Sequence, residues 1–145
     1  MPPIAAAAPL AITPEQAGVW ASVEGAMSNE QLSFSTLTSL LSRVHLAGRI
    51  DTLDGAQRSV VRDALRVYRD LREDLTTSTP VWPLGLPGWR DDWIAAGRRT
   101  ADSLLLGVWR RDGDAKVRVP LGFGPVPEVE VLYPTWGGEL VEVVT

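Results

Sequence analysis

The sequence predicts an α+β protein, with a helical N-terminal half followed by a β-rich C-terminal half. Apolar residues recur at three- and four-residue spacing up to about residue 76, as expected for helices packed on one side. After "TTSTP", short runs of alternating apolar residues are separated by glycine and proline, which is typical of strands. The 145 residues are 45% hydrophobic and 22% charged, so the chain has the composition and length of a globular domain with a core.

Two helices are expected in the N-terminal half, and each begins with a capping-box pattern. The first pairs Ser28 with Gln31 and continues through "LTSLLSRVHL" until Gly48 breaks it. The second pairs Asp54 with Gln57, and apolar residues then follow one face for about five turns. That face comprises Val60, Val61, Ala64, Leu65, Tyr68, Leu71 and Leu75.

Strands are expected in the C-terminal half. The stretch "ADSLLLGVWRRDGDAKVRVPL" predicts a hairpin that turns at Asp112-Gly113, because Asp-Gly favours two-residue hairpin turns. "EVEVLYP" and "GELVEVVT" predict two more strands, which gives an antiparallel sheet or part of a sandwich. One short strand is expected in the helical half, at residues 10–13. Neither half has enough elements to close a core alone, so both are expected to be parts of something larger.

These patterns divide the chain into residues 1–76, a tryptophan- and proline-rich crossing at 77–93, and a β domain at 94–145. The crossing contains "PVWPLGLPGWRDDW", with Trp82, Trp89 and Trp93. Tryptophan rings stack on sugars, and they also supply large buried area at domain junctions. Proline stiffens the segment, and packing at the junction is the expected role of its tryptophans.

Charge and composition narrow the possible partners. The net charge is −4, and the arginines of the second helix are interleaved with acidic residues, so neither nucleic acid nor an anionic membrane is an expected partner. The chain has no cysteine, no glycine-rich phosphate loop and no acidic cluster with calcium-loop spacing, so no cofactor or metal is expected. The apolar start "MPPIAAAAPLAI" is too short to span a bilayer, and a cytoplasmic location is expected.

Candidate catalytic side chains are few. His45, the only histidine, falls at the expected end of a helix among apolar residues, which favours a structural or exposed role over catalysis. Asp91 and Asp92 are neighbours whose side chains diverge in either an extended or a helical chain, so they cannot flank one glycosidic bond. A turn or helix-capping role is expected for both, and the sequence offers no pair of catalytic carboxylates.

The order of several segments resembles the C-terminal part of family 36 glycoside hydrolases, the α-galactosidases or melibiases. The similarity runs from about residue 12 to about residue 134 and is carried by "ITPEQAGVWA", "LLSRVHLAGRIDTL", "AQRSVVRDALRVYRDLRE", "WPLGLPGWRDDWIAAGRR" and "LLLGVWRR". It implies a large enzyme with an N-terminal β-sandwich, a central (β/α)8 barrel and a C-terminal antiparallel β domain. Such enzymes hydrolyse terminal α-galactosides with retention, using two aspartates. This chain would then supply the last barrel strand (residues 10–13), its loop and helices, and most of the β domain.

The same resemblance implies a substrate-binding loop, "PEQAGVWA", in which Gln16, Gly18 and Trp20 line a galactose pocket. Gly18 would let backbone approach the ligand, and Trp20 would pack against the ring. The alternative is a barrel-rim turn with a packed tryptophan. Val19 stands where the family pattern has asparagine, and valine cannot hydrogen-bond to a sugar hydroxyl.

The family's catalytic aspartates lie in K-W-D and S-D-D motifs, which this sequence lacks. The chain is therefore expected to be a C-terminal fragment of a retaining α-galactosidase that does not hydrolyse glycosides alone. Its expected partners are an α-galactoside and the missing barrel portion. Two alternatives stay open: a non-catalytic carbohydrate-binding module, and a non-functional relic whose open barrel edges promote aggregation.

Overall fold

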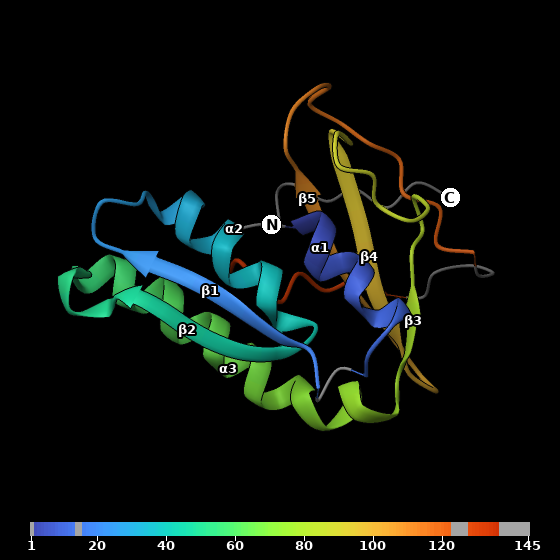
Figure 1. Cartoon of the computed structure of the whole chain (residues 1–145), viewed down its shortest axis with the longest axis horizontal. Helices are drawn as coiled ribbons and strands as arrows, with labels where there is room; N and C mark the ends of the chain where they lie inside the picture. Colours follow the sequence, from blue (N-terminus) through green and yellow to red (C-terminus); the bar gives the residue numbers. More distant parts are fainter. Residues whose placement is uncertain (1, 14–15, 123–127, 137–145) are drawn as a thin grey trace.

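The computed structural model describes residues 2–13, 16–122 and 128–136 and has a mixed α+β fold (Figure 1). The N-terminal part comprises helix α1 (Pro2–Ala7), a 3-10 turn (Ala8–Leu10), β1 (Gly18–Glu24), α2 (Asn29–Leu40), β2 (Arg43–Arg49), a second 3-10 turn (Ile50–Thr52) and α3 (Gly55–Thr77). The C-terminal part comprises β3 (Thr79–Val81), β4 (Trp93–Arg99) and β5 (Leu104–Arg110).

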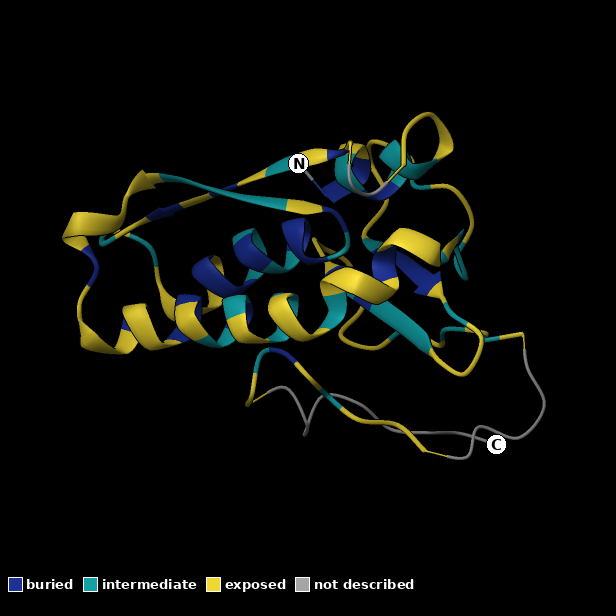
Figure 2. Cartoon of the chain, turned by 90° about the horizontal axis from the view of Figure 1, so that it is seen from below, coloured by how far each residue is buried: buried dark blue, intermediate teal, exposed yellow. Residues whose placement is uncertain are grey.

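Strands β1 and β2 form a parallel pair, in register from Gly18 opposite Arg43 to Glu24 opposite Arg49. Parallel neighbours need a crossover connection, and α2 provides it. Both α2 and α3 lie on the same side of the strand pair in Figure 2. The N-terminal half is therefore a β1–α2–β2–α3 unit in which one sheet face is covered and the other is not.

The predicted helix starts are confirmed. Ser28 Oγ accepts a hydrogen bond from the backbone N–H of Gln31 at 3.1 Å, and Gln31 Oε1 accepts from the N–H of Ser28 at 2.8 Å. Asp54 and Gln57 make the same reciprocal pair at 2.8 and 2.9 Å. The Gln57 side chain also donates to the carbonyl of Met27 at 2.8 Å, which ties the start of α3 to the loop between β1 and α2.

Three predictions in this half are wrong. The first helix was expected to continue to Gly48, but α2 ends at Leu40 and the next residues form β2. The backbone of β2 forms hydrogen bonds with β1, which is distant in the sequence, instead of continuing the helix. The expected strand at residues 10–13 is absent, because Leu10 ends a 3-10 turn and the strand begins at Gly18. His45 consequently lies on a strand and not at a helix end.

The second sheet is antiparallel with strand order β3-β4-β5. Its hairpin turns at residues 100–103, where the N–H of Thr100 donates to the carbonyl of Ser103 at 3.0 Å. The hairpin predicted at Asp112-Gly113 is wrong: the chain turns there after β5, but no strand follows in residues 114–122 or in 128–134. Strand β4 was not predicted, because its run "WIAAGR" is buried without alternation. The strand expected at "GELVEVVT" lies outside the described residues.

Two apolar clusters meet at α2, where Leu37 packs against both. The first joins β1, α2 and α3 and includes Val23, Leu32, Leu40, Leu53, Val60, Val61, Ala64 and Tyr133. The second joins α1, α2 and the antiparallel sheet and includes Ala6, Ile94, Ala96 and Trp109. Arg98 of β4 is 2% exposed, and its Nε donates to the Leu41 carbonyl at the end of α2 at 3.4 Å. A cation is favourable there because a helix C-terminus carries partial negative charge.

The tryptophan-rich crossing packs only in part as predicted. Trp82 Nε1 donates to the Ala6 carbonyl at 2.8 Å and its ring packs against the second cluster. Trp93 Nε1 donates to the Asp114 carbonyl at 3.0 Å. Trp89 is 67% exposed, so the packing role expected for it is wrong. Asp91 accepts from the N–H of Gly88 at 2.6 Å, which confirms the turn role predicted for that carboxylate.

Of the helices in the described part of the chain, none combines the length and apolar character needed to cross a membrane.

Candidate functional site

The candidate site lies on the open face of the β1–β2 sheet. Alternate residues of a strand point to opposite faces. Ala21 and Val23 of β1 are buried on the helix-covered face, together with half-buried Val19. Gly18, Trp20, Ser22 and Glu24 are exposed on the other face. Their partners across the pair are Arg43, His45, Ala47 and Arg49, so these eight residues make up the open face.

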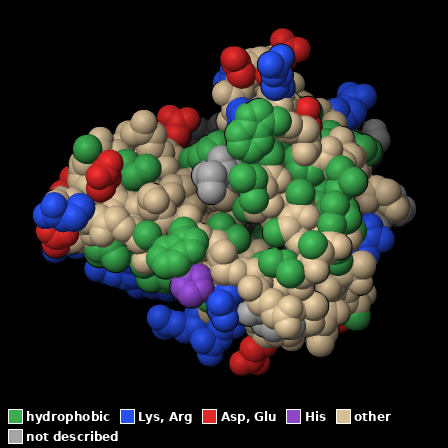
Figure 3. All heavy atoms as spheres, viewed as in Figure 1, with side chains coloured by type: hydrophobic (Ala, Val, Ile, Leu, Met, Phe, Trp, Pro, Cys, Tyr) green, Lys and Arg blue, Asp and Glu red, His purple; other side chains and the backbone are tan. Residues whose placement is uncertain are grey.

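Trp20 and His45 form an aromatic pair on this face. They are directly opposite in register, their ring centroids are 5.3 Å apart, and the angle between ring planes is 24°. Trp20 is nevertheless 67% exposed, so one side of its ring lies against the imidazole while much of the remainder faces solvent. Figure 3 shows the histidine at the surface, with hydrophobic side chains on one side and basic side chains on the other.

Arg43 is bound to the same imidazole. Its Nε donates a hydrogen bond to Nε2 of His45 at 3.1 Å, so this ring nitrogen acts as the acceptor. No ion pair within residues 2–13, 16–122 and 128–136 includes Arg43. The terminal Nη1 and Nη2 groups of its guanidinium therefore remain available for a ligand.

Gly18 makes room for this arrangement. A Cβ added at Gly18 would lie 3.1 Å from Nε2 of His45 and 3.5 Å from Nη2 of Arg43. The missing side chain thus leaves space for the arginine–histidine pair beside Trp20. We refer to Gly18, Trp20, Arg43 and His45 as the Trp20 cluster.

The sequence-predicted site is assembled in part. Gly18 and Trp20 share one face, whereas Gln16 lies exposed in the turn before β1, where its N–H donates to the Thr13 carbonyl at 3.0 Å. Among the described residues, no hydrogen bond joins the Gln16 side chain to the Trp20 cluster. Position 19 belongs to the helix-covered face, so an asparagine there would not have reached the open face beside Trp20.

Sequence reasoning missed Arg43 and gave His45 no binding role, because it predicts a helix over "SRVHLAG". The overlooked signal is its period-two alternation, in which Val44 and Leu46 separate Arg43, His45 and Ala47. The stretch "GVWASVE" alternates in the same way. Two alternating segments on either side of a capped helix are typical of a parallel βαβ unit.

The Trp20 cluster offers an aromatic face and hydrogen-bond donors, but no carboxylate. The nearest acid on the open face is Glu24, which is four residues along β1 and therefore about 13 Å from Trp20. Asp51 is paired with Arg49 at 2.8 Å, and this guanidinium holds the pKa of Asp51 below its usual range. The described residues include no group of three or more side chains suited to a metal ion. The arrangement is chemically suited to binding a ligand through stacking and hydrogen bonds.

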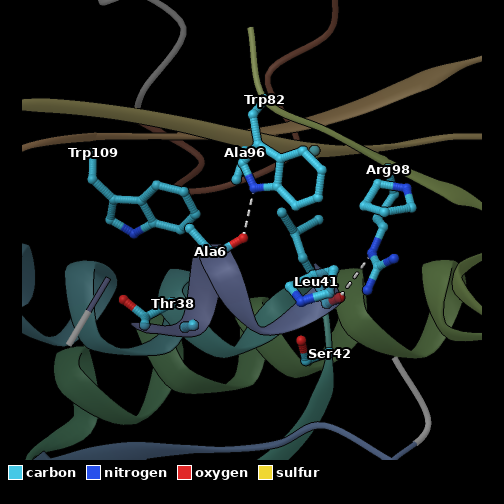
Figure 4. A pocket seen from close by; sticks show the side chains of 12 residues that line it. Ala6, Thr38, Leu41, Ser42, Trp82, Ala96, Arg98 and Trp109 are labelled. Carbon is cyan, nitrogen blue, oxygen red and sulfur yellow. Dashed lines mark hydrogen bonds between the residues drawn. The ribbon is translucent and has the colours of Figure 1, made fainter. Parts of the chain in front are cut away.

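A small cavity lies at the junction of α1, α2 and the antiparallel sheet (Figure 4). Its walls include Ala6, Trp82, Arg98 and Trp109. The cavity measures about 10 Å³, close to the minimum for a single water molecule, and cannot hold a sugar. Trp109 Nε1 is buried here without a hydrogen-bond partner in the described part of the chain, which suits a bound water better than an organic ligand.

Comparison with protein-family models, curated proteins and solved structures finds no match to this chain.

Proposed function

We propose that this chain is the C-terminal portion of a family 36 type α-galactosidase, contributing the closing part of a (β/α)8 barrel and the β domain that follows. One observation carries the proposal. The order β1–α2–β2–α3, with parallel strands and both helices on one side, matches two consecutive β/α repeats of such a barrel, and an antiparallel sheet follows it. The barrel strands in this proposal are β1 and β2, not residues 10–13.

The open sheet face supports the same proposal. A two-stranded parallel sheet is marginal by itself, since its outer edges expose unpaired backbone groups. In a complete barrel these edges pair with further strands and the open face turns inward. The catalytic aspartates would then come from the remaining barrel, because the sequence has neither a K-W-D nor an S-D-D motif.

The proposal predicts that the isolated chain does not hydrolyse an aryl α-galactoside. Mixing it with a family 36 enzyme truncated before the segment equivalent to β1 is expected to restore turnover. A matched control is Gly48→Ala, which disturbs the pairing of β1 with β2 and is expected to restore less. Turnover that tracks the purified chain contradicts the absence of catalytic groups, and failure of every truncated partner to regain activity contradicts the fragment assignment.

A second candidate function, carbohydrate binding without catalysis, is favoured by the position of Trp20. Barrel enzymes bind substrate at the carboxyl ends of their strands, whereas Trp20 is the third of seven residues in β1. Its exposed ring suits a ligand that approaches the open face of the free chain. Size-exclusion chromatography tests the relic alternative, which predicts aggregates where both proposals predict a discrete species.

A further inference from the structure

We propose that the Trp20 cluster binds a sugar acid, with the pyranose ring stacked on Trp20 and the carboxylate held by Arg43. This inference rests on the second candidate function, carbohydrate binding, and adds the ligand class to it. Neither the composition nor the net charge of −4 suggests an anionic ligand, so the inference depends on local geometry.

Trp20 provides the stacking surface. The face of an indole carries negative electrostatic potential and attracts the C–H groups of a sugar ring. His45 packs against one side of the ring at a centroid distance of 5.3 Å, which limits its side-chain freedom before any ligand arrives. A ligand that stacks on the other side therefore finds an aromatic surface already oriented, and loses less entropy on binding.

Arg43 provides the charge. Its Nε is occupied by His45 at 3.1 Å, which orients the guanidinium and leaves the Nη1 and Nη2 end for a ligand. Two parallel N–H groups match the two oxygens of a carboxylate. The guanidinium extends over Gly18, with Nη2 only 3.5 Å from where a Cβ would be. Gly18 and Trp20 are next neighbours on one strand face, about 6.6 Å apart, so one ligand can reach both groups.

The surrounding charges favour an anion. The other arginine on this face, Arg49, is neutralised by Asp51 at 2.8 Å. On the long helix, Arg66 pairs with Asp63 at 3.1 Å. Arg43 has no such carboxylate partner in the structure described above, so a ligand carboxylate complements it. Charge-assisted hydrogen bonds are roughly twice as strong as neutral ones, and we expect about a tenfold preference for the acid over the neutral sugar.

The test is a calorimetric titration of the full chain with two ligands, methyl α-galactoside and methyl α-galacturonate, which differ only at carbon 6. The contributions of the Arg43 guanidinium and the Trp20 ring are each measured with one pair of variants at exposed positions. Arg43→Gln is compared with Arg49→Gln, which removes the same charge from the same face. Trp20→Ala is compared with Trp89→Ala, whose ring is also 67% exposed but lies in the crossing. Circular dichroism verifies that all four variants fold.

We expect galacturonate to bind about tenfold more tightly than the galactoside, and more weakly at high salt. Arg43→Gln should abolish the preference while Arg49→Gln retains it, and Trp20→Ala should abolish binding of both sugars while Trp89→Ala retains it. Equal affinity for the two sugars overturns the inference but, if Trp20 is required, supports the carbohydrate-binding function. Binding of inorganic phosphate as tight as that of galacturonate also overturns the inference. If neither sugar binds, both the sugar-acid inference and the carbohydrate-binding function are wrong.

Discussion

Gly48 is the position where one added methyl group should most clearly weaken the parallel sheet. It lies on β2 opposite Val23 of β1 and has a φ of 95°, a region that L side chains rarely adopt. A Cβ there would be 2.5 Å from the Val23 carbonyl oxygen and 3.2 Å from its nitrogen. Because both contacts are with backbone, relief requires the two strands to separate.

We expect Gly48→Ala to lower the free energy of unfolding by at least about 2 kcal/mol. The left-handed backbone alone costs about 1–2 kcal/mol with a Cβ, and the overlap with Val23 adds to it. For a chain of this size, that loss corresponds to a midpoint lower by about 4–8 °C. Gly55→Ala is the matched control: it begins α3 and has no atom within 4 Å of an added Cβ, so stabilisation by about 0.4–1 kcal/mol is expected.

Urea and thermal unfolding followed by far-UV circular dichroism measure both variants. The m-value should stay unchanged, which assigns the difference to stability and not to a new unfolded state. If Gly48→Ala is as stable as Gly55→Ala, then β1 and β2 do not pair in this register and the Trp20 cluster is not assembled as described.

Two further predictions concern the N-terminal cap of α3 and the buried Tyr133. Asp54→Ala removes the acceptor for the Gln57 N–H at 2.8 Å and should destabilise the protein by about 1 kcal/mol in urea unfolding, whereas Asp54→Asn should retain most of the cap. Burial raises the pKa of Tyr133, whose hydroxyl lies 2.6 Å from Thr36 Oγ1, so the fold holds the phenol proton more tightly than the unfolded chain does. The contribution of Tyr133 to the free energy of unfolding should therefore be fully present below about pH 10 and decline above it. Tyr133→Phe should flatten that decline, and an equally steep decline in the variant would exclude Tyr133 as its source.

Local chemistry explains what was predictable from the sequence. Each capping box uses atoms three residues apart, so Ser28–Gln31 and Asp54–Gln57 signalled their helices without knowledge of the remaining fold. The apolar face of α3 follows helical spacing for the same reason. The turn role of Asp91 is also local, because its carboxylate accepts a hydrogen bond from the N–H of Gly88, three residues earlier.

Strands were less predictable because their hydrogen-bond partners are distant in sequence. The residues of β2 were assigned to a helix because leucines precede them at helical spacing, yet their backbone pairs with β1, 25 residues earlier at Gly18 and Arg43. Strand β4 is buried at five consecutive positions, so it shows no alternation. The Asp112-Gly113 signal correctly marks a turn, but no partner strand follows it in residues 114–122.

The sequence by itself determined where the two long helices begin, and it predicted Gly18 and Trp20 as site residues. Only the tertiary structure decided what surrounds those two residues. Parallel pairing in one register sets Trp20 opposite His45 and Gly18 opposite Arg43, and a shift of one residue would have turned the entire set to the helix-covered face. Register depends on α2 packing across both strands, which is a property of the folded chain and not of any short stretch of it.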